Sequence, residues 1–258
     1  EDSNKFQRSN QLHERILTAR FCQHLPIQNK KSIPFHFLHM LFFFELLKTF
    51  LMIYYKKMTL NTVKGFLDNI EGEELVKIVK KCSNLGPCLE IGTYCGKSAL
   101  LLGNACKDTN NLVFTIDHHT GSEEHQMGEE YHDRELYDKN ISSFNTLPEF
   151  LNNLRSSNLQ NYILPIIGNS KEISQRWELP VGLVVIDGGH SRKAAFDDYE
   201  SWHPHILMGG YLLIHDVFPN PNDGGRPPYE VFCEAKKSKN FEEIKLVKSL
   251  AILKKVSI

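Results

Sequence analysis

A strand–turn–helix pattern spans Cys88 to Leu102, where the sequence reads CLEIGTYCGKSALLL. A short apolar run leads into Gly92 and Gly96, and an apolar-periodic stretch then continues to the end of the segment. This order is typical of a buried β-strand, a tight turn and a helix. Glycines let the backbone of such a turn approach a ligand, and the free amides of the helix N-terminus face that ligand. The stretch therefore predicts a ligand-binding turn.

Glu90 is the unusual residue of this stretch, because a carboxylate at the end of a buried strand needs a partner. We predict that the partner is a ligand rather than another side chain. On this interpretation Glu90 organises a turn that receives a cofactor carrying positive charge.

Short apolar runs alternate with amphipathic stretches along the rest of the chain, which predicts a parallel α/β sheet covered by helices on both faces. The spacing of Val63, Phe66 and Leu67 predicts a helix from Thr59 onward. Polar residues follow the ends of the predicted strands: Glu90, Asp117, Asn169–Ser170, Asp187 and Asp216. In open α/β sheets ligands bind along this edge, so we expect the functional site there.

Two common phosphate-binding turns do not fit this pattern. A Walker A loop ends in Gly-Lys-Ser as here, but Ile91 stands where that loop needs its first glycine. The dinucleotide fingerprint needs a glycine where this chain has Tyr94. What remains is an E-x-G-x-x-x-G turn, followed by Asp117, whose carboxylate suits a ribose diol.

The run LEIGTYCG is similar to motif I of the class I S-adenosylmethionine-dependent methyltransferases. The runs VIDGGHS (185–191) and GGYLLIHDV (209–217) resemble a bacterial small-molecule branch with a D-G-x-H motif. This branch comprises Methyltransferase-24-type and metal-dependent O-methyltransferases, and the resemblance covers about residues 60–258. It implies a Rossmann-like, mostly parallel sheet of seven strands with the last strand antiparallel.

The resemblance also implies how S-adenosylmethionine is held. The turn from Gly92 to Gly96 would contact its amino-acid part, Asp117 the ribose, and Asn169–Ser170 the surroundings of the adenine. The complete predicted cofactor-binding set is Glu90, Gly92, Thr93, Tyr94, Gly96, Ser98, Asp117, His118, Asn169, Ser170 and Asp187.

The predicted catalytic residues lie at two adjoining strand ends; they are Asp187, His190, His215 and Asp216. Two roles stay open. In the first, His190 or His215 is the general base for an acceptor hydroxyl. In the second, Asp187 and Asp216 hold Mg or Mn, and the third ligand is a histidine, tentatively His215 and otherwise His190, or a residue of the histidine-rich segment 118–140. Metal-dependent relatives usually have Asp or Asn after the second acid, where this chain has Val217.

We predict methyl transfer to a small hydroxylated acceptor, most simply at oxygen. Two alternatives are kept: an NAD-linked oxidoreductase, against which the absent G-x-G-x-x-G counts, and a non-catalytic cofactor-binding module. The polar segment 118–140 is rich in histidine, and we interpret it as a lid over the acceptor, with a plain surface insertion as the alternative.

We expect a methyltransferase domain over residues 58–258, preceded by an extension, 1–57, that is either helical or non-native upstream sequence. The apolar block 35–55 in this extension contains charged residues, so no stable membrane span is expected. A formal net charge of -1 gives no indication of a nucleic-acid partner. Six cysteines without a C-x-x-C pair indicate reduced thiols and a cytoplasmic protein. A homo-oligomer is left open.

Overall fold

The computed structural model describes residues 43, 46, 62–129 and 131–257. Apart from Phe43 and Leu46, the predicted extension 1–57 lies outside the described residues. The helices and strands from α3 onward belong to one compact unit, Lys56–Ile258. Within the described part of the chain, no helix is long and apolar enough to cross a bilayer.

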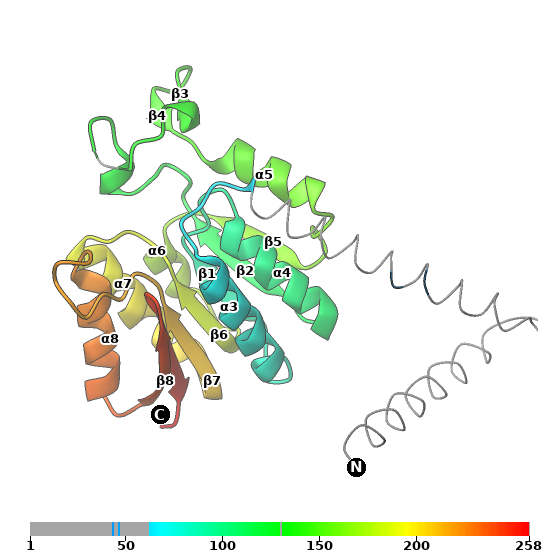
Figure 1. The fold of residues 1–258 in the computed structure, drawn as a ribbon, viewed down its shortest axis with the longest axis vertical. Helices are drawn as coiled ribbons and strands as arrows, with labels where there is room; N and C mark the ends of the chain where they lie inside the picture. Colours follow the sequence, from blue (N-terminus) through cyan, green and yellow to red (C-terminus); the bar gives the residue numbers. More distant parts are fainter. Residues whose placement is uncertain (1–42, 44–45, 47–61, 130, 258) are drawn as a thin grey trace, which may run out of the picture. The chain divides into compact units, whose positions relative to one another are not determined.

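A seven-stranded sheet forms the centre of this unit (Figure 1). Its strands, in spatial order, are β5 (Ile163–Ile167), β2 (Val113–Asp117), β1 (Cys88–Ile91), β6 (Val181–Ile186), β7 (Ile206–Ile214), β9 (Leu250–Lys255) and β8 (Phe241–Val247). Neighbouring strands from β5 to β7 are parallel, whereas β9 runs antiparallel to both β7 and β8. The predicted seven-stranded, mostly parallel sheet with an antiparallel last strand is confirmed.

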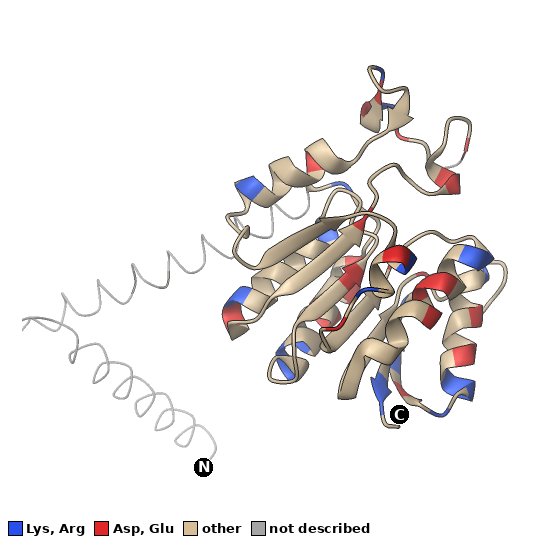
Figure 2. Cartoon of the chain, turned by 180° about the vertical axis from the view of Figure 1, so that it is seen from behind, with Lys and Arg blue, Asp and Glu red and all other residues tan. Residues whose placement is uncertain are grey.

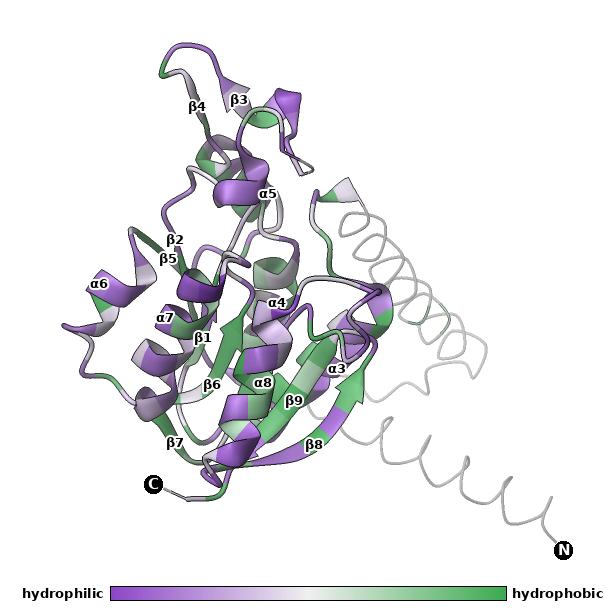
Figure 3. Ribbon diagram, turned by 90° about the vertical axis from the view of Figure 1, so that its left-hand side faces the viewer, coloured by the Kyte–Doolittle hydropathy of each residue, from purple (hydrophilic) through white to green (hydrophobic). Residues whose placement is uncertain are grey.

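Helices pack on both faces of the sheet, as expected (Figure 1). One face carries α3 (Asn69–Cys82), α4 (Lys97–Thr109) and α5 (Leu147–Ser156). The other carries α6 (Ser170–Ser174), α7 (Arg192–Trp202) and α8 (Pro227–Lys237). Successive strand residues alternate between the two cores, so that Cys88 faces the first and Leu89 the second. Figure 3 shows the apolar strands β6 and β9 beside the more polar helix α8.

The helix predicted from Thr59 is interrupted, because residues 63–68 are irregular and α3 begins only at Asn69. Asp68 caps the helix: its carboxylate accepts the N–H of Ile70, and Glu71 accepts the N–H of Asp68. This reciprocal capping box sets the start of the helix. The apolar spacing in this region therefore predicted the burial of Val63 and Leu67 correctly, but it was wrong for Phe66 and for the type of structure.

Residues 118–146, which we call the insertion, connect β2 to α5 and project beyond one end of the sheet (Figure 1). Their elements are short: η1 (Glu123–His125), η2 (Arg134–Leu136), β3 (Tyr137–Asp138) and β4 (Ser143–Phe144). Lys64, in the segment before α3, pairs with Asp133 at 2.5 Å and with Glu135 at 2.6 Å. The segment before α3 is therefore tied to the insertion.

Acidic and basic residues are mixed along the outer helices (Figure 2). On α7, for example, Asp197 pairs with Lys193 at 2.6 Å and with Lys171 of α6 at 2.7 Å. Such exposed pairs contribute little to stability. Their mixture agrees with the formal net charge of -1.

Candidate active site

The turn after β1 needs glycine because it lies against the backbone that follows β6. Gly92 has a φ of +88°, and a Cβ added there would lie 1.9 Å from the carbonyl oxygen of Asp187. Gly96, with a φ of +94°, has the ring of Phe150 at 2.7 Å from such a Cβ. The close neighbours of the turn are protein atoms, the backbone of Asp187 at Gly92 and the ring of Phe150 at Gly96, whereas its approach to a ligand stays a prediction.

Asp117 holds this turn in place. Its Oδ2 accepts the backbone N–H groups of Thr93 at 2.8 Å and Tyr94 at 2.9 Å, and its Oδ1 accepts that of His119 at 2.7 Å. A carboxylate has about four acceptor positions, so these three bonds leave room for a further donor. Asp117 therefore joins the glycine turn to the start of the insertion at the end of β2.

Glu90 is completely buried, and its side chain lines neither of the cavities described below. Among the described residues, neither carboxylate oxygen has a hydrogen-bond partner. Burial raises the pKa of Glu90 to about 8, and the charge of Asp187 adds to this rise. In the ligand-free protein Glu90 therefore lies under the turn as a buried acid with a raised pKa, and its contact with the cofactor stays a prediction.

Glu90→Gln should stabilise the ligand-free protein, and more so as the pH rises. Between the usual pKa of 4.5 and the folded value of about 8, unfolding releases the proton of Glu90. The free energy of unfolding of the wild type should therefore fall by about 1.4 kcal/mol per pH unit relative to the variant. Denaturant unfolding at pH 5, 6.5 and 8 measures this difference. Glu178→Gln, at an exposed position, is the control; a difference that is independent of pH would contradict the assignment.

Two cavities adjoin the glycine turn. The groove, of about 760 Å³, runs past Asp117, His118, Asn169 and Ser170. The ring-lined cavity, of about 450 Å³, has Phe66 and Tyr131 in its wall. Both walls share Gly92, Tyr94, Glu124, His125, Asp187, Gly188 and His190. The two cavities therefore meet where the glycine turn faces the end of β6.

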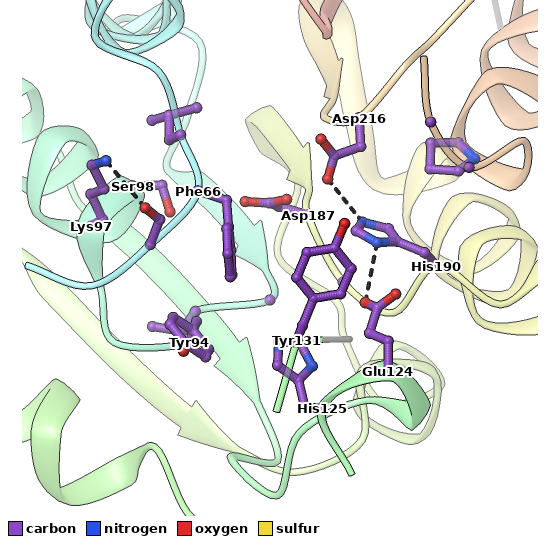
Figure 4. A pocket seen from close by; sticks show the side chains of 18 of the residues that line it. Phe66, Tyr94, Lys97, Ser98, Glu124, His125, Tyr131, Asp187, His190 and Asp216 are labelled. Atoms are coloured by element: carbon purple, nitrogen blue, oxygen red, sulfur yellow. Dashed lines mark hydrogen bonds and ion pairs between the residues drawn. The ribbon is translucent and has the colours of Figure 1, made fainter. Parts of the chain in front are cut away.

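Three side chains converge where the cavities meet. Asp187, His190 and Asp216 each offer a ligand atom, and these atoms all lie within 4.8 Å of one another (Figure 4). His190 Nε2 lies 3.2 Å from Asp216 Oδ2. Burial opposes protonation of His190, but Asp216 and Glu124 outweigh it and raise its pKa to about 10. Burial would raise the pKa of Asp216, yet His190 and His215 hold it well below its usual range.

His215 lies behind this cluster and is almost fully buried. Its Nδ1 lies 3.0 Å from Asp187 Oδ1, and its Nε2 lies 3.1 Å from Glu71 Oε2 of α3. Glu71 also accepts the backbone N–H and the hydroxyl of Ser249. Both ring nitrogens of His215 are thus engaged by carboxylates. The structure therefore places His190, not His215, as the third member of the cluster.

The other predicted cofactor-binding residues are distributed as follows. Thr93 and Ser98 line the ring-lined cavity. Asn169 caps α6 by accepting the N–H of Glu172 at 3.2 Å, and the Ser170 hydroxyl bonds the carboxylate of Asp198. Both still line the groove, as does His118. The structure thus brings the predicted set, apart from Glu90, to the walls of the two cavities or to the turn between them.

Of the other insertion histidines in the predicted lid, only His125 lines both cavities. His119 is buried, stacks on Phe150 and bonds Thr146 at 2.7 Å, which is a structural role. His132 contacts the ring of Tyr137 within the insertion.

Three residues of the site were not predicted from the sequence: Glu71, Glu124 and, as a cavity residue, Phe66. Glu71 fits the pattern of a helix N-terminal capping box, and this pattern gives no indication of its second partner, His215. Glu124 is one of several acids in an aperiodic segment. Phe66 is 62% exposed in the ring-lined cavity, although its spacing matched a helix core.

Known proteins share this fold, and a family model matches the central part of the sequence. A family model described as a methyltransferase domain matches residues 89–217. The O-methyltransferase NovP has 17% sequence identity and a TM-score of 0.56, over 72% of this chain and 79% of its own. A putative caffeoyl-CoA O-methyltransferase from Staphylococcus aureus has 16% identity and a TM-score of 0.53, over 84% and 99%. The methyltransferase PaMTH1 of Podospora anserina, bound to S-adenosylhomocysteine (SAH), has 13% identity and a TM-score of 0.54, over 75% and 80%.

Proposed function

The chain belongs to the methyltransferase-domain family, and from this premise we propose that it transfers the methyl group of S-adenosylmethionine to a hydroxyl oxygen of a small acceptor. One observation carries the proposal: a groove along the carboxyl ends of the strands opens, at the glycine turn, onto the cluster of Asp187, His190 and Asp216. We assign residues 58–258 to the methyltransferase domain.

The groove fits the proposed cofactor. Its volume of about 760 Å³ is in the range that accommodates a ligand of this size. The turn from Gly92 to Gly96 and Ser98 would hold the amino-acid part where the two cavities meet, since Gly92 and Tyr94 line both cavities and Thr93 and Ser98 line the adjoining ring-lined cavity. Asp117 and His118 would hold the ribose, and Asn169 and Ser170 the adenine. The sulfonium of the bound cofactor supplies an activated methyl group, and these residues orient it.

The ring-lined cavity is the proposed acceptor site. Phe66 and Tyr131 line this cavity and not the groove, and their ring centroids are 5.5 Å apart. Both are substantially exposed, at 62% and 43%. Rings of this kind favour an acceptor with a flat, apolar body whose hydroxyl reaches the acidic cluster.

The cluster fits a divalent cation. Two carboxylates and one imidazole form a donor set suited to Mg or Mn, and we assign the three positions to Asp187, His190 and Asp216. A cation held there would lower the pKa of the acceptor hydroxyl. His215, proposed above as a tentative ligand, instead holds the carboxylate of Asp187 from behind.

The five described cysteines are free thiols, and a cytoplasmic location remains part of the proposal.

Binding and transfer assays test the proposal. By isothermal titration we expect SAH to bind and NAD not to bind. With methyl-labelled S-adenosylmethionine and Mg or Mn, the label should pass to 3,4-dihydroxybenzoate in preference to the puckered shikimate, and EDTA should abolish transfer. NAD binding without SAH binding would favour an oxidoreductase. SAH binding without transfer to any hydroxylated acceptor would favour a non-catalytic module.

A further inference from the structure

Glu124 of the insertion reaches into the cluster at the end of β6. Its Oε1 lies 3.1 Å from His190 Nδ1 (Figure 4). The hydroxyl of Ser122 donates to the same oxygen at 3.0 Å. Both members of the pair are largely shielded from solvent, since the Glu124 side chain is 25% exposed and that of His190 is 30% exposed. The contact therefore lies in the shared wall of the two cavities.

The two nitrogens of His190 thus face two different parts of the chain. Nδ1 faces Glu124 of the insertion, whereas Nε2 faces Asp216 at the end of β7. A carboxylate that accepts one imidazole N–H fixes the orientation of the ring and leaves the other nitrogen for its ligand or proton partner. The pair with Glu124 therefore determines that Nε2 is the atom directed at the cluster.

The position of Glu124 depends on the attachment of the insertion. Lys64 pairs with Asp133 and Glu135, and the ring of His125 lies 5.6 Å from that of Tyr94 in the glycine turn. A carboxylate on β6 or β7 would stay beside His190 whether or not the insertion were docked. Glu124 lies on a short 3₁₀ helix within the insertion, so it is beside His190 only when the insertion is docked.

We propose that Glu124 is a positioning residue for methyl transfer, which orients His190 so that the reaction centre is complete only when the insertion is docked. The expected effect on kcat rests on the proposed function, whereas the contact between Glu124 and His190 does not. The insertion, which the sequence predicts to be a lid over the acceptor, would then also supply one side chain that the centre requires.

Two variants separate the hydrogen bond from the charge. Glu124→Ala removes the acceptor for Nδ1–H, and we expect kcat with S-adenosylmethionine and 3,4-dihydroxybenzoate to fall by about 10- to 100-fold, the usual effect of losing such a partner. Glu124→Gln keeps an amide oxygen that can accept the same N–H, so most of the rate should return. The Kd for SAH should stay within about threefold of the wild type in both, because neither variant changes a residue proposed to hold the cofactor.

Glu135→Gln is the matched control, because it removes another insertion carboxylate, 81% exposed and outside both cavities. In this variant Lys64 still pairs with Asp133, so the insertion stays attached and we expect the wild-type rate. A loss of rate equal to that of Glu124→Ala would show that docking alone matters and would overturn the proposal.

Nuclear magnetic resonance of protein labelled with ¹⁵N-histidine tests the contact without any turnover. The Nδ1–H signal of His190, assigned by its loss in His190→Gln, should be present in the wild type and in Glu124→Gln but absent or shifted in Glu124→Ala. An unchanged signal in Glu124→Ala overturns the inference whatever the activity. Failure of the wild type to bind SAH would instead refute the proposed function, and the resonance result would still decide the role of Glu124 toward His190.

Discussion

Gly92→Ala is expected to abolish measurable SAH binding, a loss of at least about 100-fold in affinity. The added Cβ would lie 1.9 Å from the carbonyl oxygen of Asp187, and the residue has a φ of +88° that alanine rarely adopts. The glycine turn or the end of β6 must therefore move, and both belong to the shared wall of the two cavities. Isothermal titration with SAH, together with the melting temperature, measures the effect.

Gly128→Ala is the control for backbone strain. Gly128 also has a positive φ, +96°, but nothing lies within 4 Å of the position its Cβ would take. This variant should show the cost of a left-handed alanine, about 1 kcal/mol, and keep SAH affinity. If both variants lost affinity equally, the contact between the glycine turn and Asp187 would not be what the cofactor site requires.

Asp216→Asn is expected to lower kcat by about 10²- to 10⁴-fold while SAH affinity is kept. Asp216 is not among the residues proposed to hold the cofactor and does not line the groove, so its loss should affect the reaction centre rather than cofactor binding. The amide removes the negative charge that pairs with His190 at 3.2 Å and His215 at 3.4 Å. Asparagine is preferred to alanine in this test, because residue 216 has a φ of +55°, a region that asparagine tolerates.

The measurement combines steady-state kinetics on 3,4-dihydroxybenzoate with SAH titration. Asp108→Asn is a suitable control, since Asp108 of α4 forms an exposed pair, at 3.8 Å, with Lys80 of α3. Equal loss of SAH affinity and kcat in Asp216→Asn would show that the carboxylate supports the whole site rather than the transfer step. An unchanged kcat would remove Asp216 from the reaction centre.

The arrangement of the acidic residues could be predicted because it follows from strand order. Parallel strands end at the same edge of a sheet, so residues directly after them are neighbours. Ile186 pairs with Ile214 in the register of β6 and β7, which places Asp187 beside the His215–Asp216 pair. The sequence pattern therefore predicted both the sheet and the carboxylates of the cluster.

The choice between the histidines could not be predicted in this way. His190 and His215 both follow a strand end, but they enter different surroundings. His215 is buried against α3, where its Nε2 contacts the carboxylate of Glu71. His190 lies in the wall of both cavities, where its Nδ1 contacts the carboxylate of Glu124. Side-chain direction and distant partners decided their roles, and neither has a local sequence signal.

The positions of the strands along the chain, the glycine turn after β1 and the edge at which the site lies could be predicted from the sequence. These features follow from short-range patterns: hydrophobic period, turn residues and the polarity of strand ends. Three-dimensional packing was needed to show that Gly92 lies against the backbone of Asp187, that Glu90 is fully buried with a raised pKa, and that Glu124 and Phe66 line the site. These contacts join segments far apart in the chain, and their geometry is set by packing rather than by local sequence.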